Sequence, residues 1–324
     1  MPRIVLFSYP GSPWGAKVIS YLSLRGIEYS ECCQPMTWPR PDLQLLNIQY
    51  RRIPFISIGK DIYYDSSLIF EKLEALYPQQ PLGAKEPSGK TLEKLVEKWA
   101  EGSLLNSVMN LLPKSLPFLS DSIFLADRKE LWGKEFSPDA LEKGLTKSLV
   151  EIREHFAVLE NLLGDGRQWL LDSEKPGLID IHAAFCFDWI INIPGAQINE
   201  FISASAYPFT WRWLDRYRHA IAASQKQGAA ITQLTGHDAT NLILESDFAE
   251  RAVTVMDDPT RLQEGQVVAL YRIDDMSSSV KHRDVGRLVG LTPHETVVAI
   301  KAKASDVEIR VHAPRWQFEV EVAL

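Results

Sequence analysis

The fold of this chain is decided by the stretch Phe7-Ser8-Tyr9-Pro10-Gly11-Ser12-Pro13-Trp14-Gly15-Ala16-Lys17-Val18, where an apolar strand-like run ends and a helix begins. Serine is a preferred N-cap residue, and proline is preorganised for the first helical position. The free amide N–H groups of such a helix start carry partial positive charge, which favours an anion such as a thiolate. The stretch therefore predicts a strand followed by a helix, with the hydroxyl of Ser12 at the N-terminus of that helix.

Composition indicates a globular protein of two or three domains, because the chain has 324 residues, of which 45% are apolar and 24% charged. The net charge of −7 argues against nucleic acid or an anionic membrane as the main partner. The three cysteines, two of them adjacent, make a poor disulfide framework and favour a reducing compartment. Strand-like sequence follows the N-terminus at once and no apolar run approaches membrane-spanning length, so we expect no signal peptide, no membrane partner and a cytoplasmic location.

Residues 1–82 are predicted to form a first domain of mixed strands and helices. The segments follow one another as strand, helix, strand, helix, strand, strand, helix, and Gly26 is a suitable C-cap for the first helix. We expect strands at 4–7, 28–33, 55–58 and 61–64, and helices at 13–25 and 66–77. This order predicts a sheet that combines a parallel pair with an antiparallel hairpin.

Residues 83–250 are predicted to form an all-helical domain, which follows a linker rich in proline and glycine at 78–87. Apolar residues recur every three or four positions, as expected for helices that pack in a bundle. The long helical segments are 91–112, 138–163, 178–191 and 208–227. The third of these helices is expected to begin at Gly177, an acceptable N-cap, with Asp180 in its first turn.

Residues 251–324 are predicted to form a small all-β domain, because short β runs alternate there with turns rich in Asp, Ser, Gly and Pro. The runs are 267–273, 285–291, 296–302, 308–312 and 318–322. Residues 252–324 contain nine Lys or Arg and eleven Asp or Glu, which disfavours nucleic-acid binding. A single helix is expected between 236 and 257, and we expect this β module to dock on the helical domain.

Two further motifs support the first. Arg52-Ile53-Pro54-Phe55 places a proline before an apolar strand, and Tyr64-Asp65-Ser66-Ser67-Leu68-Ile69 places an acid and two hydroxyls at a helix start. With the helix start at Ser12, these motifs resemble the N-terminal domain of the cytosolic glutathione S-transferases. The resemblance to the general pattern covers residues 3 to about 227. The longer layout resembles filamentous-fungal glutathione-transferase-like proteins with an added β domain, which are often associated with specialised metabolism. The expected fold is a thioredoxin-like α/β domain, an α-helical domain and an appended β domain.

The resemblance implies a glutathione site in the first domain. Ser12 would stabilise the glutathione thiolate, and Tyr9 is the alternative, since some transferase classes use a tyrosine near this strand end. The Ile53-Pro54 bond would be cis, and the backbone of Ile53 would pair with the cysteinyl part of glutathione. Asp65 would receive the γ-glutamyl ammonium, while Ser66 and the helix N-terminus would receive its carboxylate. The other interpretation of these residues is a helix cap, a turn and an aromatic side chain beside a pocket.

Two parts of the expected site stay open in the sequence. The glycyl carboxylate needs a cation or an amide donor, and the candidates before Pro54 are Arg40, Gln49, Arg51 and Arg52. The candidates for contact with the electrophile are Trp14, Trp38, Asn106, Met109 and Asn110. Ordinary packing or surface charge explains these residues equally well.

Other chemistries are disfavoured by their spacing. Cys32 and Cys33 suggest thiol exchange, but the redox position of the fold is Ser12 and its partner position is Gly15, so the dithiol is missing. His282, His294 and His312 lack the short spacing of zinc ligands, and no metal site is expected.

The sequence therefore predicts a cytoplasmic, homodimeric glutathione S-transferase-like enzyme that adds the glutathione thiolate to an apolar electrophilic small molecule. The alternatives are a glutathione-dependent isomerase or lyase, a glutathione-independent enzyme on the same fold, and a non-catalytic interaction module.

Overall fold

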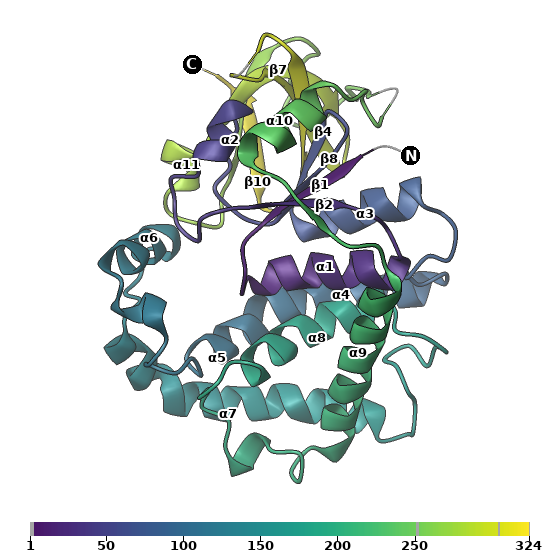
Figure 1. Ribbon diagram of the computed structural model, residues 1–324, viewed down its shortest axis with the longest axis vertical. Helices are drawn as coiled ribbons and strands as arrows, with labels where there is room; N and C mark the ends of the chain where they lie inside the picture. The colour runs from purple at the N-terminus through teal and green to yellow at the C-terminus, as the bar shows by residue number, and fades with distance from the viewer. Residues whose placement is uncertain (1–2, 251–252, 304, 324) are drawn as a thin grey trace.

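A ten-stranded sheet runs through the upper part of the computed structural model, which describes residues 3–250, 253–303 and 305–323 (Figure 1). The strand order is β10-β6-β7-β8-β9-β4-β3-β1-β2-β5. The strands are β1 (Ile4–Ser8), β2 (Ser30–Cys33), β3 (Phe55–Ile58), β4 (Asp61–Tyr64), β5 (Thr232–Gln233), β6 (Val267–Arg272), β7 (Asp284–Leu291), β8 (Glu295–Lys301), β9 (Glu308–Pro314) and β10 (Phe318–Val322). The sheet thus joins segments from the two ends of the chain.

The thioredoxin-like part has the predicted order of elements. Strand β1 pairs in parallel with β2 and antiparallel with β3, and β3 forms a hairpin with β4. Its helices are α1 (Pro13–Arg25), α2 (Pro41–Leu45) and α3 (Ser66–Leu76). Ser12 caps α1, Gly26 ends it in the left-handed region at φ 61°, and the Ile53-Pro54 bond is cis, as expected. A second cis bond, Trp38-Pro39, was not predicted.

The helical domain lies below the sheet in Figure 1. Its helices are α4 (Pro87–Trp99), α5 (Leu105–Met109), α6 (Ser122–Trp132), α7 (Pro138–Leu163), α8 (Leu178–Ile191) and α9 (Pro208–Gln227), with a π-helical turn at Ala100–Leu104 between α4 and α5. The bounds of α7, α8 and α9 are the predicted ones, whereas α6 was missed. Among the described residues, no helix is both long and apolar enough to cross a membrane.

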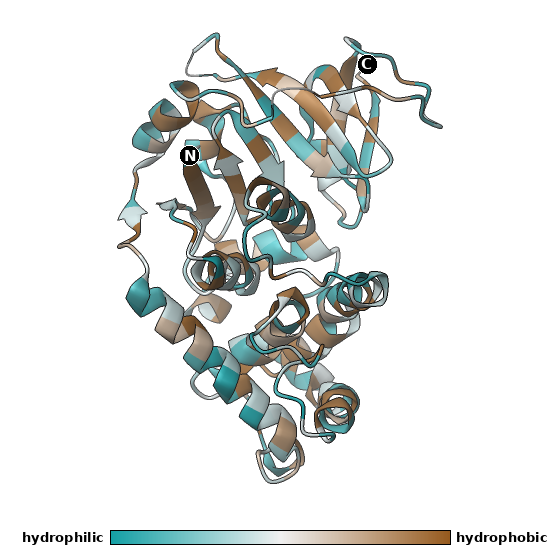
Figure 2. Ribbon diagram, turned by 90° about the vertical axis from the view of Figure 1, so that its right-hand side faces the viewer, coloured by the Kyte–Doolittle hydropathy of each residue, from teal (hydrophilic) through white to brown (hydrophobic). Residues whose placement is uncertain are grey.

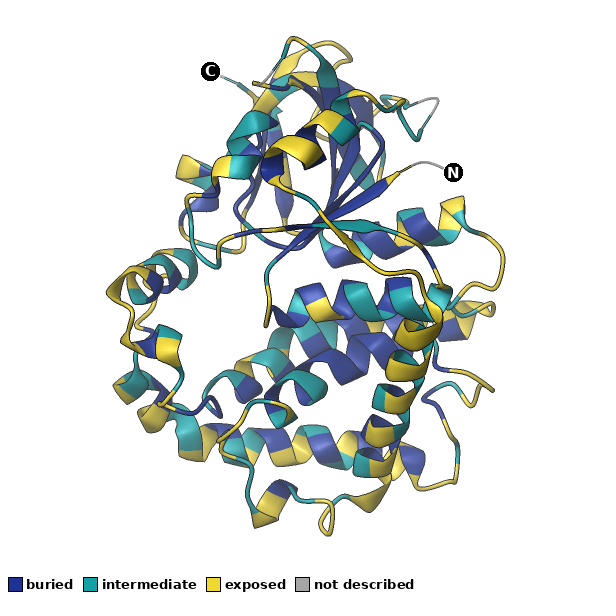
Figure 3. Cartoon of the chain, in the orientation of Figure 1, coloured by how far each residue is buried: buried dark blue, intermediate teal, exposed yellow. Residues whose placement is uncertain are grey.

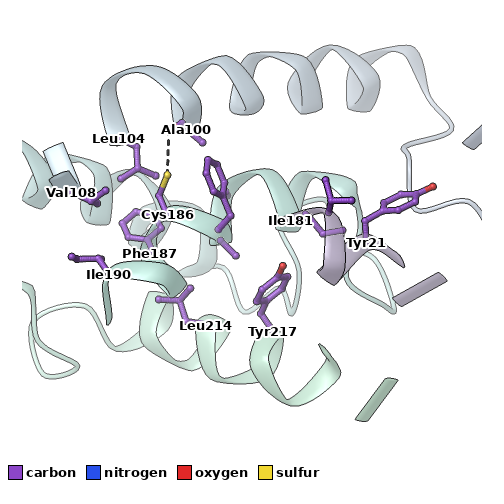
Figure 4. Close-up of a cluster of buried hydrophobic side chains, with 14 of the residues drawn as sticks. Tyr21, Ala100, Leu104, Val108, Ile181, Cys186, Phe187, Ile190, Leu214 and Tyr217 are labelled. Atoms are coloured by element: carbon purple, nitrogen blue, oxygen red, sulfur yellow. Dashed lines mark hydrogen bonds between the residues drawn. The ribbon is translucent and has the colours of Figure 1, made fainter. Parts of the chain in front are cut away.

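Helix α8 forms the centre of the helical domain. Cys186, Phe187 and Ile190 of this helix lie in one buried cluster with residues of the π-helical turn and α9, and Ile181 lies beside Tyr21 of α1 (Figure 4). The predicted start of α8 is confirmed, because the Gly177 N–H donates to Asp180 Oδ2 at 2.9 Å. Burial raises the pKa of Asp180 to about 6, although three hydrogen bonds from backbone N–H groups and Trp213 favour its charged form.

Both faces of the thioredoxin-like sheet are covered, so its strands are apolar on both sides. In β1, Ile4 and Leu6 pack with the cluster that contains α1 and α3, whereas Val5 and Phe7 pack with the cluster on the opposite face. The strands are accordingly coloured as hydrophobic in Figure 2 and as buried in Figure 3. The outer face of α7 is largely exposed in Figure 3, as expected for a helix at the edge of a bundle.

The β module exists as predicted and contacts the helical domain, for example through Lys281 and Glu130 at 3.2 Å, but its strand pairing is with another domain. It joins the sheet of the thioredoxin-like domain, because β9 pairs in parallel with β4, with Asp61 opposite Arg310 and Tyr63 opposite His312. The unpaired N–H and C=O groups of an edge strand favour such an addition over packing on helices. The predicted start of this domain at residue 251 lies outside the described residues.

The segment after α9 also returns to the sheet. Strand β5 pairs with β2 at the other edge, and α10 (Gly236–Leu244) packs against α2. Ala239 and Ile243 of α10 are buried in the cluster on that face of the sheet. The predicted helical domain of 83–250 therefore ends in elements that pack on the thioredoxin-like domain.

A buried ionic cluster lies at the junction of β4 and β9. His312 is fully buried, with Nε2 2.9 Å from Asp61 Oδ1 and Nδ1 2.7 Å from Glu295 Oε1. Arg310 donates to both oxygens of Asp61, at 2.6 and 2.9 Å. Lys72 Nζ donates to Glu250 and Glu295, at 2.6 Å each. Three carboxylates face two permanent cations, so the cluster is neutral only when His312 is protonated.

His312→Gln should lower the free energy of unfolding most at acidic to neutral pH. Burial alone would lower the pKa of His312, but the hydrogen bonds to Asp61 and Glu295 raise it above its usual value. Its contribution is therefore complete below about pH 6.5, the pKa of an unfolded histidine, and is lost as the pH rises through the raised pKa. Urea unfolding of both proteins between about pH 6 and pH 9 tests this. A difference that grows with pH would contradict it.

Candidate functional site

A cavity of about 290 Å³ lies where the thioredoxin-like domain, the helical domain and the β module meet. The thioredoxin-like domain contributes most of the predicted site, namely Tyr9, Trp14, Arg40, Arg52, Ile53, Pro54, Asp65 and Ser66. The structure therefore brings together residues that are spread over more than fifty positions of the sequence. Residues from the other two parts complete the walls.

Ser12 acts as the N-cap of α1 and is not one of the residues that line this cavity. Its Oγ accepts a hydrogen bond from the Gly15 N–H at 3.0 Å, and the residue is 2% exposed. Tyr9 and Trp14, on either side of Ser12 in sequence, line the cavity. Gly15 occupies the position where a redox-active dithiol would have its second cysteine. A Cβ at Gly15 would lie 2.2 Å from Ser8 Oγ, so a cysteine would not fit there unless Ser8 moved. The cap role of Ser12 is confirmed, and its action on a thiolate stays a prediction.

Asp65 and Ser66 form the N-terminus of α3 at the cavity. Asp65 is the N-cap, with φ 68°, and its Oδ1 accepts from the Ser67 N–H at 3.0 Å. A positive φ is uncommon for a residue other than glycine and is often found at functional sites. The Asp65 Oδ2 accepts from Arg272 Nη1 at 2.6 Å. Burial alone would raise the pKa of Asp65, but Arg272 and the Ser67 N–H hold it below its usual value.

Ser66 belongs to a buried charged network that the sequence did not reveal. Lys17, which is fully buried, donates to Ser66 Oγ at 3.1 Å and to Glu101 Oε1 at 2.8 Å. Ser66 Oγ donates to the same oxygen of Glu101 at 3.2 Å, and Glu97 lies 3.9 Å from Lys17. Burial alone would lower the pKa of Lys17, but the two glutamates raise it. The available signal was the position of Lys17, one turn before the buried Tyr21 on α1.

The arginines proposed for the glycyl carboxylate are bound within the protein. Arg52 forms ion pairs with Asp274 and Asp275, at 2.9 Å each. Arg51 donates to Asp127 of α6 and to Ser277 of the β module, at 2.8 and 2.7 Å. The interpretation of Arg51 and Arg52 as surface charges is therefore wrong, because each guanidinium group binds side chains of another domain.

Arg40 differs from these two arginines. Its guanidinium donates to the backbone carbonyl oxygens of Pro35, Met36 and Arg51, and within the described part of the chain it forms no ion pair. Burial lowers its pKa to about 10, which leaves it charged at neutral pH. The backbone N–H of Gln49 donates a hydrogen bond to Asp284 Oδ1 at 2.7 Å. Arg40 thus lines the cavity without a carboxylate partner among the described residues, so it is the candidate to bind an anionic ligand.

The apolar end of the cavity differs from the prediction. Trp14 lines it as expected, together with Leu131 and Trp132 of α6 and Trp316 of the β module. Helix α6 was missed, although Asp121 before it and Gly133 after it are good capping residues. The aromatic side chains therefore come from three separate parts of the chain.

The other four residues proposed for electrophile contact lie elsewhere. The Trp38 ring packs edge-on against His282, with centroids 4.8 Å apart, and the Trp38 N–H donates to Asp127. Asn110 donates to Ser148 Oγ of α7 at 2.9 Å, and Met109 packs in the core of the helical domain. Asn106 is exposed. Helical spacing alone did not show which face of α5 is turned toward α7.

The free cysteines, and the group of potential metal ligands found among the described residues, lie outside this cavity. Cys32 and Cys33 are free, and burial raises the pKa of the Cys32 thiol to about 12. Among the described residues, Glu250, Glu295 and His312 bring one potential ligand atom each within 4.8 Å of one another. Lys72 donates to both of these glutamates, so their negative charge is already matched by a protein cation.

Lys17→Met should destabilise the protein by about 3 to 5 kcal/mol, because it leaves the buried Glu97 and Glu101 without their main counter-charge. Lys147→Met is the matched control, since Lys147 is 80% exposed and pairs only with Glu151 of its own helix. Urea unfolding measures both changes, and the control should lose less than about 0.5 kcal/mol. Equal losses in the two variants would contradict the role assigned to Lys17.

Comparison with known proteins agrees with this geometry. Residues 6–81 match the family model of the glutathione S-transferase N-terminal domain, and residues 107–226 match a model described as a domain of unknown function (DUF7962). No curated protein sequence matches the chain.

Solved structures share the fold. A GST-like protein from Pseudomonas syringae is 21% identical, with a TM-score of 0.76 over 100% of both chains. The β-etherase LigF from Sphingobium sp. strain SYK-6 is 18% identical, with a TM-score of 0.53 over 69% of this chain and 99% of its own. Rice GST1, solved in complex with glutathione, is 17% identical, with a TM-score of 0.51 over 75% and 95%. At these identities the likeness shows a shared fold, which agrees with the match of residues 6–81 to the glutathione S-transferase N-terminal domain.

Proposed function

We propose that this protein is a glutathione-dependent enzyme that adds the glutathione thiolate to an electrophilic carbon of an apolar small molecule. The observation that carries the proposal is the composition of one cavity. It is lined by Ile53 and Pro54, by Asp65 and Ser66 at the start of α3, and by the aromatic side chains of Trp14, Trp132 and Trp316. Such a cavity offers polar groups for a peptide beside an apolar surface for a second substrate.

The residues at the cavity suggest how glutathione lies. The γ-glutamyl end would lie at Asp65 and Ser66, where the start of α3 favours a carboxylate. The backbone of Ile53 would pair with the cysteinyl part. The glycyl carboxylate would lie at Arg40, because Arg51 and Arg52 already pair with aspartates. This order directs the thiol toward Tyr9 and the N-terminus of α1.

The start of α1 would then stabilise the thiolate. A free thiol has a pKa of about 8.5, and helix N-termini lower it. Ser12 Oγ accepts one hydrogen bond from the Gly15 N–H, so its own proton can be donated to the sulfur after a small displacement of the ligand or side chain. Tyr9 is the alternative donor, and it lines the cavity directly.

The aromatic end of the cavity would hold the electrophile. Trp14, Leu131, Trp132 and Trp316 provide an apolar surface there. A reversible thiolate addition could equally cleave or isomerise a substrate, and one of the structures that share the fold is a β-etherase. A glutathione-independent reaction or a purely structural role would leave the polar end of the cavity unexplained. The homodimer, the cytoplasmic location and the link to specialised metabolism stay predictions from the sequence.

Calorimetry with glutathione tests the binding proposal. The protein should bind glutathione, and Ser66→Ala should weaken it about ten-fold, because removing a partner of a charged group costs about 1.5 to 3 kcal/mol. Ser205→Ala, on the exposed loop before α9, is the control and should bind as the unmodified protein does. Absence of any binding to the unmodified protein would overturn the proposed function.

Turnover of chlorodinitrobenzene with glutathione tests the assignment of Ser12. Ser12→Ala should lower kcat about ten-fold or more while glutathione affinity stays within a few-fold, because the hydroxyl acts on the thiolate. Ser137→Ala is the matched control: Ser137 is the N-cap of α7, so the variant loses an equivalent helix cap far from the cavity. Full activity of Ser12→Ala with an inactive Tyr9→Phe would assign the role to Tyr9 instead.

A further inference from the structure

The β module reaches the cavity with two segments. Strand β6 ends at Arg272, which pairs with Phe318 at the start of β10. The turns next to these residues bring Asp274, Trp316 and Gln317 to the cavity wall. The module therefore contributes directly to the walls of the site, beside the start of α3.

Arg272 connects the module to the start of α3 in the thioredoxin-like domain. Its side chain is 5% exposed. Nη1 donates to Asp65 at 2.6 Å, Nε and Nη2 donate to Asp274 at 2.7 and 2.8 Å, and Nη2 also donates to Gln317 at 2.7 Å. The guanidinium carbon lies 4.9 Å from the centre of the Phe318 ring. These contacts fix Arg272 in one orientation and occupy most of its donors.

Asp65 depends on this contact for its position. Its backbone adopts φ 68°, a conformation that most residues avoid, and its carboxylate is held by two groups, the Ser67 N–H and Arg272. One of these groups is local, and the other comes from a strand more than two hundred residues away. Without Arg272, the carboxylate would keep a single partner and be free to turn away from the cavity.

The charges around Arg272 favour a ligand cation. Asp65, Asp274 and Asp275 are joined through ion pairs to Arg272 and Arg52. Three carboxylates and two guanidinium groups leave one negative charge on this cluster. A free α-amino group, as at the γ-glutamyl end of glutathione, would complete its neutrality.

We propose that Arg272 is a positioning residue for thiol-peptide binding: it holds Asp65 in the orientation that receives the α-amino group, so that the β module is an obligatory part of the γ-glutamyl subsite. This rests on the proposed function, because it requires that glutathione binds in this cavity. Arg272 acts through Asp65 and Asp274, since its own donors are used within the protein. The catalytic step at the thiol is then independent of Arg272.

A double-mutant cycle on glutathione affinity tests this, using Arg272→Met, Asp65→Asn and the double variant in the full-length protein. Each single variant should weaken glutathione about ten-fold, and the double variant should be no weaker than Asp65→Asn alone. The KM for glutathione should rise in Arg272→Met, while kcat at saturating glutathione stays within about two-fold. Arg272→Lys, which keeps the charge, should recover part of the affinity.

The control is Arg287→Met, because Arg287 lies in the same module, is 48% exposed and pairs with Glu308 on its surface. It should leave glutathione affinity and KM unchanged. Where Arg272→Met fails to fold, Gln317→Leu removes one of the groups that hold Arg272 and should weaken glutathione a few-fold. Unchanged affinity in the Arg272 variants, or losses that add in the double variant, would overturn the proposal. Failure of the unmodified protein to bind glutathione would instead overturn the proposed function.

Discussion

The pairing of β9 with the outer edge of β4 is the contact on which the rest of this structure depends. An open edge strand leaves a row of unpaired backbone groups, and β9 satisfies those of β4 from Asp61 to Tyr63. Through this one pairing the module adds β6 to β10 to the sheet, while β5 covers the opposite edge at β2. The C-terminal module and the thioredoxin-like domain thereby share one sheet.

Buried charges fix the register of that pairing. Arg310 and His312 of β9 both meet Asp61 of β4, and side chains two positions apart lie on the same face of a strand. A shift by one residue would turn both side chains to the opposite face and leave Asp61 buried without a partner. The cost of burying Asp61, Arg310 and His312 means that such a cluster contributes more to choosing one register than to net stability. The same reasoning applies to Lys17, which links α1 to Ser66 and Glu101.

The shared sheet also decides what the cavity contains. Strands β6 and β10 lie at the far end of the strand order, yet Arg272 at the end of β6 donates a hydrogen bond to Asp65 at the start of α3. Helix α6 closes the cavity from the helical domain, where Asp127 pairs with Arg51. Arg51 and Arg52, which the sequence analysis proposed as ligands of the glycyl carboxylate, therefore connect the three parts of the protein. Among the described residues, Arg40 has only backbone carbonyl partners.

Local chemistry was sufficient to predict most of the elements, though not α6, and several polar residues of the site. Ser12 with Pro13 is a local signal for the start of a helix, and Gly26 is one for its end. Helical periodicity predicted the bounds of α7, α8 and α9 to the residue. These signals act over one or two helical turns. The motifs at Pro54 and at Asp65-Ser66 likewise identified residues that the structure places at one cavity. The tertiary structure alone decided which surfaces meet: that β9 pairs with β4, that Arg52 pairs with Asp274, and that Trp14, Trp132 and Trp316 line one cavity. Those contacts join residues up to about two hundred and fifty positions apart, and they depend on edge pairing and burial, for which a single sequence carries no local signal.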